Sequence, residues 1–185
     1  MEPKQEHFFK EIVKFAIIAF LIVAPVRFFV AQPFIVSGAS MQPTFETGEY
    51  LIIDQLSYHF ESPERGDVII FRYPKDPHKF FIKRIIGLPN ETVTIRGTDI
   101  TIKNADNPDG TPLPEPYLEE GTARGDFLSI ALGPDEYFVL GDNRNASSDS
   151  RVWGPVPEEN IIGRAFLRLL PIGEASVLPG QYANE

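Results

Sequence analysis

Hydrophobic residues are distributed along this chain in two ways: one long block near the N-terminus, followed by many short runs. The block extends from Ile12 to Val30 and contains one proline and two charged residues. As a helix, its nineteen residues would measure roughly 28 Å, close to the thickness of the hydrocarbon core of a bilayer. Eight of the twelve residues 15–26 are Phe, Ile, Leu or Val, so the block is hydrophobic on all sides. We therefore predict a transmembrane anchor over residues 12–30.

Positive charges are unequally distributed around this block. Three lysines lie within the first fourteen residues, whereas no lysine or arginine follows Arg27 until Arg65. The positive-inside rule therefore places residues 1–11 in the cytoplasm and the rest of the chain outside. A cleaved signal peptide would need small residues at a processing site after the apolar segment, and a buried soluble helix would be apolar on one side. Both alternatives fit less well than a single-pass anchor in the plasma membrane.

The short runs after the block are typical of β-strands. They are rich in β-branched and aromatic residues, and Gly, Pro, Asn and Asp separate them. The runs are YLIIDQL, DVIIFRY, FFIKRII, TVTIR, DITIK, EYFVL and RAFLRLL. We predict a mostly β domain, a barrel or sandwich, over residues 31–175, with a hairpin turn at 96–99. Residues 104–126 are polar and proline-rich, which predicts a long loop or small lobe, and residues 176–185 a frayed tail.

Composition excludes several functions. The net charge is −9, from 26 acidic and 17 basic residues, which argues against a nucleic-acid partner. The chain has no cysteine, so disulfides, thiolate metal sites and thiol catalysis are impossible. Its three histidines, His7, His59 and His78, are far apart in sequence, which disfavours a zinc site. We therefore expect no metal and no other cofactor.

Ser40, in VSGASMQPTF, lies about ten residues beyond the predicted anchor. A serine beside glycine is usually a turn residue, and a nucleophilic serine would need a base. His59 and His78 both lie in polar segments, which disfavours them. Lys83 is the alternative: on a strand it shares one face with Phe81 and Ile85. Either its stem packs while the amine reaches water, or burial lowers its pKa enough for it to accept a proton from serine.

The segment GDNRNASSDSR, residues 141–151, follows a predicted strand and is almost entirely polar. It is either a solvated loop or part of a site. In a solvated loop, Asp149 and Arg151 would form a structural ion pair. Ser147 or Ser148 would be able to orient a neutral lysine by hydrogen bonding, as a third group orients the base in a catalytic triad.

Four motifs follow one another after the hydrophobic block: SGASMQPTF, RGDVIIF, FIKRIIGLPN and GDNRNASSDSR. In content and order they resemble the conserved boxes of type I signal peptidases, the bacterial leader peptidase family of Ser-Lys serine proteases. The resemblance extends from about Val26 to Leu169. It implies a membrane-anchored endopeptidase that removes signal peptides from secreted preproteins, cutting after small residues of the Ala-x-Ala type. Such an enzyme needs no cofactor. We expect a monomer whose partners are preproteins and the lipid bilayer, and no nucleic acid.

The resemblance also implies a role for individual residues. Ser40 is implied to be the nucleophile, Lys83 the general base, and Ser147 the serine that holds the lysine. Asp142 with Arg84 and Asp149 with Arg151 are implied to be supporting pairs, and the backbone at Ser40 and Gly38 is implied to bind the oxyanion. The residues implied to line the substrate pockets are Met41, Phe45, Phe81 and Ile82. The chain departs from the family pattern at Asn90-Glu91, often Gly-Asp, at Asn145-Ala146, usually Asp-Asn, and at Gly38, where some members have serine. Two alternatives stay open: a related Ser-Lys processing peptidase, and a membrane-anchored β domain that binds partners without catalysis.

Overall fold

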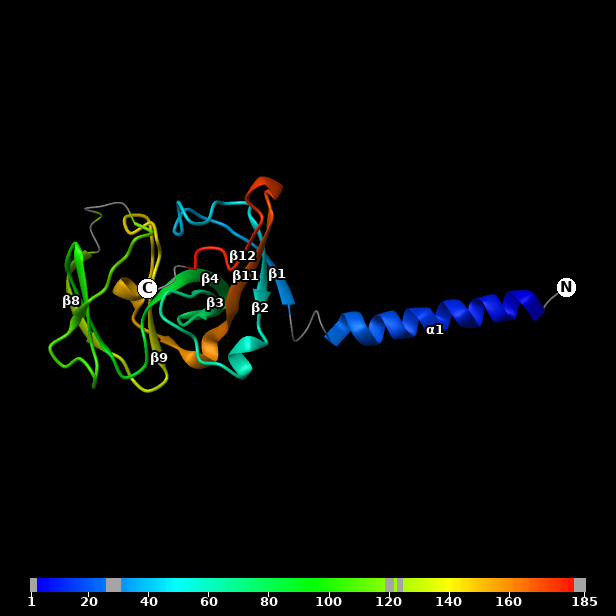
Figure 1. The fold of residues 1–185 in the computed structure, drawn as a ribbon, viewed down its shortest axis with the longest axis horizontal. Helices are drawn as coiled ribbons and strands as arrows, with labels where there is room; N and C mark the ends of the chain where they lie inside the picture. The colour runs from blue at the N-terminus through cyan, green and yellow to red at the C-terminus, as the bar shows by residue number, and fades with distance from the viewer. Residues whose placement is uncertain (1–2, 26–30, 119–121, 123–124, 182–185) are drawn as a thin grey trace.

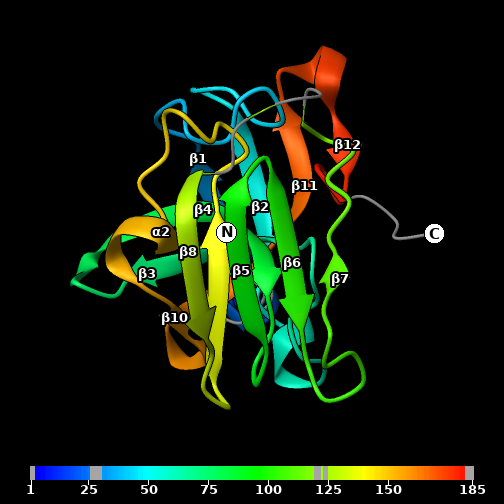
Figure 2. The same cartoon turned by 90° about the vertical axis from the view of Figure 1, so that its left-hand side faces the viewer.

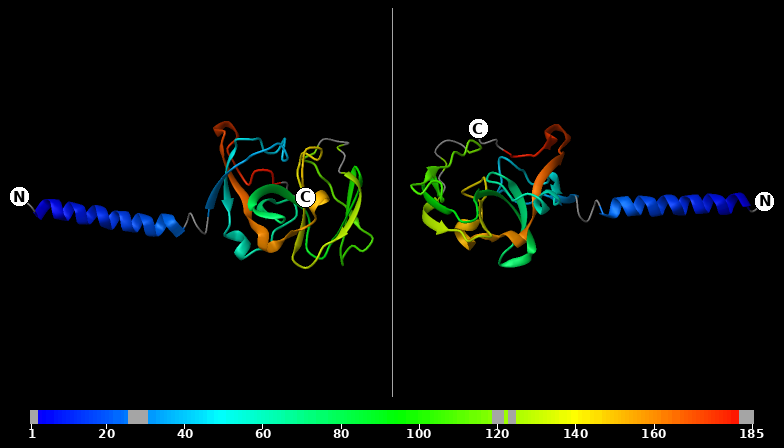
Figure 3. Two further views of the ribbon diagram at one scale, coloured as in Figure 1. Left: turned by 180° about the vertical axis from the view of Figure 1, so that it is seen from behind. Right: turned by 60° about the horizontal axis from the view of Figure 1, so that its bottom comes forward.

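The structure is a computed structural model that describes residues 3–25, 31–118, 122 and 125–181. Its first element is helix α1 (Pro3–Pro25), which extends away from the β elements in every view that shows its length (Figures 1 and 3). Of the helices in these ranges, none is both long enough and apolar enough to cross a membrane. The predicted segment 12–30 is therefore helical up to Pro25, and residues 26–30 lie outside the described part of the chain.

The remaining elements are mostly β-strands, as predicted. The larger sheet is antiparallel, and every strand predicted in it is present. Its order is β1 (Ala31–Ile35), β2 (Tyr50–Asp54), β11 (Ile161–Leu170), β3 (Val68–Tyr73), β4 (Asp76–Gly87), β9 (Glu136–Leu140) and β10 (Val156–Pro157), and β12 (Ser176–Val177) pairs with β11. Strand β4 begins earlier than predicted, so His78 lies in a strand. A short helix α2 (Ser150–Trp153) follows the 141–149 loop.

The second sheet has four strands in the order β7 (Thr111–Pro112), β6 (Asp99–Lys103), β5 (Thr92–Gly97) and β8 (Gly125–Ala131), and Figure 2 shows it in front of the larger sheet. The predicted hairpin is confirmed, because Arg96 pairs with Asp99 in the β5–β6 register. The polar stretch 104–126 contributes β7 and the first residues of β8. Sequence analysis did not predict β8.

The second half of strand β4, from Lys83 to Gly87, is buried on both faces, and this burial places Lys83. Phe81 and Ile85 pack with Ile69 in one apolar cluster, whereas Ile82 packs against a second cluster on the other face. The predicted alternation of side chains along this strand is therefore confirmed. It puts the Lys83 side chain on an interior face, where a charged amine loses its hydration.

The turn after β4 explains one departure from the family pattern. Asn90 has φ 64°, the left-handed conformation that glycine adopts most easily and that asparagine tolerates better than other residues. Glu91 accepts a hydrogen bond from the Leu88 N–H at 2.8 Å and pairs with Arg65 at 2.7 Å. The Asn-Glu pair therefore forms an ordered turn where the family often has Gly-Asp.

The prediction of a frayed C-terminal tail is wrong for the part of it that the structure describes. Ser176 and Val177 form β12 against β11, and the Leu178 N–H donates to the Phe166 carbonyl at 2.7 Å. The Gly180 carbonyl accepts a hydrogen bond from Arg84. These backbone partners, which a polar sequence does not reveal, hold the segment in place. Residues 182–185 lie outside the described ranges.

Candidate active site

Ser40 lies in the loop between β1 and β2, residues 36–48, which we call the nucleophile loop because it carries the candidate nucleophile. Gly38 has φ 98°, a conformation that favours glycine, and the Thr47 hydroxyl bonds to both its N–H and its carbonyl at 3.1 Å. The Asn143 N–H donates to the Ser40 carbonyl at 3.0 Å. The loop is thus fixed at its start and at Ser40 itself, so the Ser40 hydroxyl is held in a defined place.

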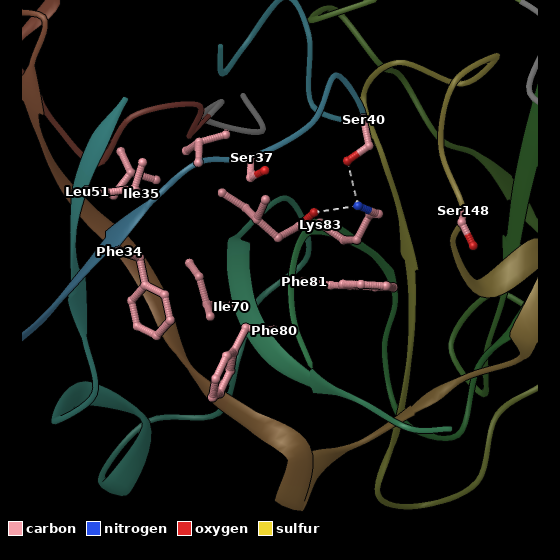
Figure 4. Close-up of a pocket in the computed structure, with 12 residues that line it drawn as sticks. Phe34, Ile35, Ser37, Ser40, Leu51, Ile70, Phe80, Phe81, Lys83 and Ser148 are labelled. Carbon is pink, nitrogen blue, oxygen red and sulfur yellow. Dashed lines mark hydrogen bonds between the residues drawn. The ribbon is translucent and has the colours of Figure 1, made fainter. Parts of the chain in front are cut away.

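Lys83 and Ser40 come together although 43 residues separate them. The Lys83 Nζ donates to the Ser40 Oγ at 2.7 Å and to the Ile82 carbonyl at 2.7 Å, as Figure 4 shows. Lys83 is only 4% exposed, and its Nζ lies 5.5 Å from the centre of the Phe81 ring. The alternative in which the amine reaches bulk water is therefore excluded by its burial.

Burial lowers the pKa of Lys83 from its ordinary value of 10.5 to about 8. The carboxylates of Asp149 and Asp142 act in the opposite direction, because negative charge favours the protonated amine. Each of these carboxylates is paired with an arginine, which weakens its effect on the lysine. At neutral pH about a tenth of Lys83 side chains are then neutral, whereas a free lysine is almost entirely protonated.

The predicted pair of Asp142 with Arg84 is present and fully buried. Arg84 donates through Nε and Nη2 to the two Asp142 oxygens, at 2.8 and 2.6 Å. The Thr44 hydroxyl in the nucleophile loop donates to the same carboxylate at 2.6 Å. The pair therefore connects strand β4, through Asp142, to the loop that carries Ser40.

The predicted pair of Asp149 with Arg151 is also present. Arg151 donates through Nε and Nη2 to the Asp149 carboxylate, at 2.8 Å for each bond. Asp149 also accepts from the Gly141 N–H at 3.2 Å and caps helix α2. A side chain at Gly141 would collide with the Ser40 carbonyl and the Ser147 hydroxyl, so a glycine is needed at this approach.

Two predicted hydrogen-bonding roles are not met. The Ser147 hydroxyl is buried and has no hydrogen-bond partner within the described residues, because the Lys83 amine bonds to Ser40 and to the Ile82 carbonyl instead. The Gly38 N–H donates to Thr47, so it is not free to bind an oxyanion. In the described part of the chain the Ser40 N–H makes no hydrogen bond, and it remains the candidate donor.

A pocket of about 390 Å³ opens beside the Ser40–Lys83 pair. It is lined by Phe34, Ile35, Val36, Ser37, Ser40, Leu51, Ile70, Phe80, Phe81, Ile82, Lys83 and Ser148. Phe81 and Ile82 line it as expected. Met41 and Phe45, which were also expected at the substrate pockets, are almost fully buried in the core and do not line this pocket. Neither His59 nor His78 lines it.

The positions of Thr44 and of most of the apolar wall of the pocket could not be predicted from the sequence. Thr44 is part of the motif that contains Ser40, but nothing in the sequence shows that its hydroxyl reaches Asp142, 98 residues further along the chain. Phe34 and Phe80 come from different strands and meet edge to face, with ring centres 5.6 Å apart. Only the fold brings these residues together.

The chain is similar to known proteins of one family. The family model "Signal peptidase, peptidase S26" matches residues 9–170, so the chain belongs to the signal peptidase family and is a serine endopeptidase. It is similar to the probable signal peptidase I-1 of Synechocystis sp., with 38% identity over 91% of this chain and 86% of that protein. It is also similar to the signal peptidase I of Leptolyngbya laminosa, with 37% identity over 96% of this chain and 87% of that protein. A crystal structure of a signal peptidase I from Enterococcus faecalis matches with a TM-score of 0.47 and 30% identity, over 56% of this chain and 97% of that chain.

Proposed function

We propose that this signal peptidase removes signal peptides from secreted preproteins, with Ser40 as nucleophile and Lys83 as general base. The observation that carries the proposal is the 2.7 Å approach of the Lys83 Nζ to the Ser40 Oγ at the edge of an apolar pocket. A buried amine with a lowered pKa is the activating base that a nucleophilic serine needs.

The acylation step uses both residues. When Lys83 is neutral, the hydrogen bond reverses, so that the Ser40 hydroxyl donates to the lone pair of Nζ. The Oγ attacks the scissile carbonyl while its proton passes to Nζ. The ammonium then gives that proton to the departing amine as the peptide C–N bond breaks, which leaves an ester on Ser40. The Ser40 N–H supports the oxyanion of the tetrahedral intermediate.

Deacylation repeats the same proton transfers with water. Neutral Lys83 accepts a proton from a water molecule that attacks the ester carbonyl. The Ser40 oxygen then leaves and takes the proton back, so the enzyme returns to its starting state. The signal peptide carries the new carboxylate, and the mature protein carries the new amine.

Two open strand edges beside the pocket support an extended substrate. Strand β1 is the outer strand of the larger sheet, and β4 pairs with β9 only from Arg84 onward. Among the described residues, the edge of 80–83 that faces away from β3 therefore has no strand partner. A peptide placed there as an added strand would direct alternate side chains into the pocket. We propose that small residues such as alanine occupy the first and third positions before the cut, as the resemblance to signal peptidases implies.

We further propose that residues 12–30 anchor the chain in the plasma membrane, with the N-terminus cytoplasmic and the β domain outside. This proposal is supported by the sequence alone: residues 12–30 are mostly hydrophobic, and three lysines lie within the first fourteen residues. None of the described helices has the length and hydropathy of a membrane span. Ile35 and Phe80 are exposed beside the pocket and would rest in the headgroup layer, close to a preprotein held in the same bilayer. Release of the chain from membranes by alkaline carbonate would contradict this anchor.

The proposal is tested with the full-length chain in detergent and a preprotein substrate. The cut site is read from the masses of both products, and Ser40→Ala provides the background. We expect cleavage after Ala-x-Ala, and its loss when phenylalanine replaces the alanine directly before the cut. Cleavage with no dependence on that residue would favour a different processing peptidase. Binding of preprotein without cleavage would favour a binding domain.

The pKa of Lys83 predicts how activity depends on pH. Below the folded-state pKa the amine is protonated and does not accept a proton, and above it the amine is neutral and active. We therefore expect kcat/KM to rise with pH on the acid side with a midpoint near pH 8. The same midpoint should persist in a His59→Gln, His78→Gln variant. A midpoint near 6.5 that disappears in this variant would assign the base to a histidine.

A further inference from the structure

A short segment that follows strand β7 of the second sheet contacts two buried arginines near Ser40, Arg84 and Arg144. This strap, residues 113–118, follows β7, and the Leu113 N–H ties its start to the Ile100 carbonyl of β6 at 2.9 Å. Two of its polar side chains are withdrawn from solvent: Glu115 is buried, and Tyr117 is partly buried. They belong to the polar stretch 104–126, for which the sequence predicts a long loop or small lobe.

Tyr117 covers the Arg84 side chain. The guanidinium carbon of Arg84 lies 4.0 Å from the centre of the Tyr117 ring, a distance at which a cation and an aromatic face attract each other. The Tyr117 hydroxyl donates to Glu115 at 2.7 Å, which fixes the orientation of the ring. Arg84 thus contacts the Tyr117 ring through the face of its guanidinium and the Asp142 carboxylate through its Nε and Nη2 atoms, so both partners help to hold it in place.

Glu115 forms the second connection. Its carboxylate pairs with Arg144 in a bridge that is almost completely buried. Arg144 in turn donates through Nε to the Gly141 carbonyl at 2.9 Å. Gly141 lies directly against the Ser40 carbonyl, and Asn143, which bonds to that carbonyl, is the residue before Arg144. The strap therefore supports the loop of residues 141–149, which contacts the Ser40 carbonyl.

We propose that Tyr117 and Glu115 are positioning residues for the Ser40–Lys83 pair. Tyr117 acts through Arg84, Asp142 and Thr44, and Glu115 acts through Arg144 and Gly141. Both routes end on the nucleophile loop, and neither strap residue lines the pocket in which the substrate is proposed to lie. This inference rests on the proposed serine–lysine hydrolysis and assigns a role in it to the second sheet.

The proposal makes a specific kinetic prediction. Residues that hold the attacking oxygen in place, without contacting substrate, affect the chemical step and leave binding unchanged. Loss of the Tyr117 ring should therefore lower kcat by about 10-fold to 100-fold, the range that a displacement of about 1 Å produces, while KM changes little. Tyr117→Phe keeps the ring over Arg84 and loses only the hydroxyl, so it should retain most of kcat.

The experiment compares four forms of the full-length chain in detergent: wild type, Tyr117→Leu, Tyr117→Phe and Phe127→Leu. Phe127 is the matched control, because its ring also lies beside an arginine, 5.6 Å from the Arg96 guanidinium carbon, but it is exposed on β8. kcat and KM are measured on a soluble peptide, and the rate at which Ser40 is acylated by an activated peptide ester is followed by intact mass. If Tyr117→Leu does not fold, Glu115→Gln, which preserves shape and removes the charge, takes its place.

The expected result is a lower kcat and slower acylation in Tyr117→Leu, recovery in Tyr117→Phe and no effect in Phe127→Leu. Wild-type kcat in folded Tyr117→Leu, or in folded Glu115→Gln where that variant replaces it, would overturn the proposal. A rise in KM alone would also overturn it, because that result would place the residue in substrate binding. If wild type itself does not cleave, the proposed function has failed, which is a separate result from failure of the strap.

Discussion

We expect Ser40→Ala and Lys83→Met each to lower kcat by about 10⁴-fold or more, and the double variant to be no slower than the slower single variant. The reason is that the two side chains act as one unit. Without the amine, the Ser40 hydroxyl keeps its proton and attacks poorly, and without the hydroxyl, the amine has no nucleophile to activate. Methionine suits the lysine position because it is unbranched and apolar, so it fills the same buried space between Phe81 and the Ile82 carbonyl.

The measurement is kcat for preprotein cleavage by the four members of this cycle, under conditions in which all four remain folded. Lys79→Met is the control, since Lys79 lies on the same strand and is mostly exposed, beside Asp76. Its kcat should match that of wild type. If the two single losses multiplied in the double variant, the residues would act independently, and the 2.7 Å contact between them would not be the basis of catalysis.

The periodicity of the chain predicted most of the longer strands, although not β8, and it left open whether the Lys83 amine is buried or reaches water. Alternation along β4 placed Lys83 on one face with Phe81 and Ile85, and the structure confirms the alternation because those two residues pack in one cluster and Ile82 packs in another. Periodicity reports which face a residue occupies. It does not report which residue of another strand lies opposite, so the approach of Lys83 to Ser40 required the resemblance to a known family.

Predictions failed where polar residues gain partners from distant parts of the chain. Glu115 belongs to a stretch whose composition is typical of a solvated loop, yet it is buried against Arg144, 29 residues later. Met41 and Phe45 flank the serine in sequence, but the turn of the nucleophile loop directs them into the core instead of the pocket. In both cases the deciding contact is tertiary, and neither local composition nor spacing encodes it.

We expect Arg84→Met to lower the free energy of unfolding by about 3–5 kcal/mol, because it leaves the Asp142 carboxylate buried without its cation. Arg84 and Asp142 are both fully enclosed, and the arginine also donates to the Gly66 carbonyl at 2.9 Å. Removing the guanidinium therefore lowers the free energy of unfolding by more than the attraction within one ion pair, because the hydrogen bond to Gly66 is lost as well and a buried charge is left unpaired. It also removes the group that holds the carboxylate to which Thr44 is bonded.

The double variant Arg84→Met, Asp142→Leu should be less destabilised than the sum of the two single variants, since it removes the unpaired charge and leaves an apolar contact. Unfolding by urea is followed by the fluorescence of Trp153, the single tryptophan of the chain, which is buried. Arg96→Met, an exposed arginine on β5, is the control and should change the free energy by less than about 0.5 kcal/mol. Equal losses in Arg84→Met and Arg96→Met would show that the buried pair does not stabilise the fold. A double variant that regains stability but not kcat would assign the pair to the placement of Ser40, since the apolar replacement restores the packing without restoring a carboxylate for Thr44.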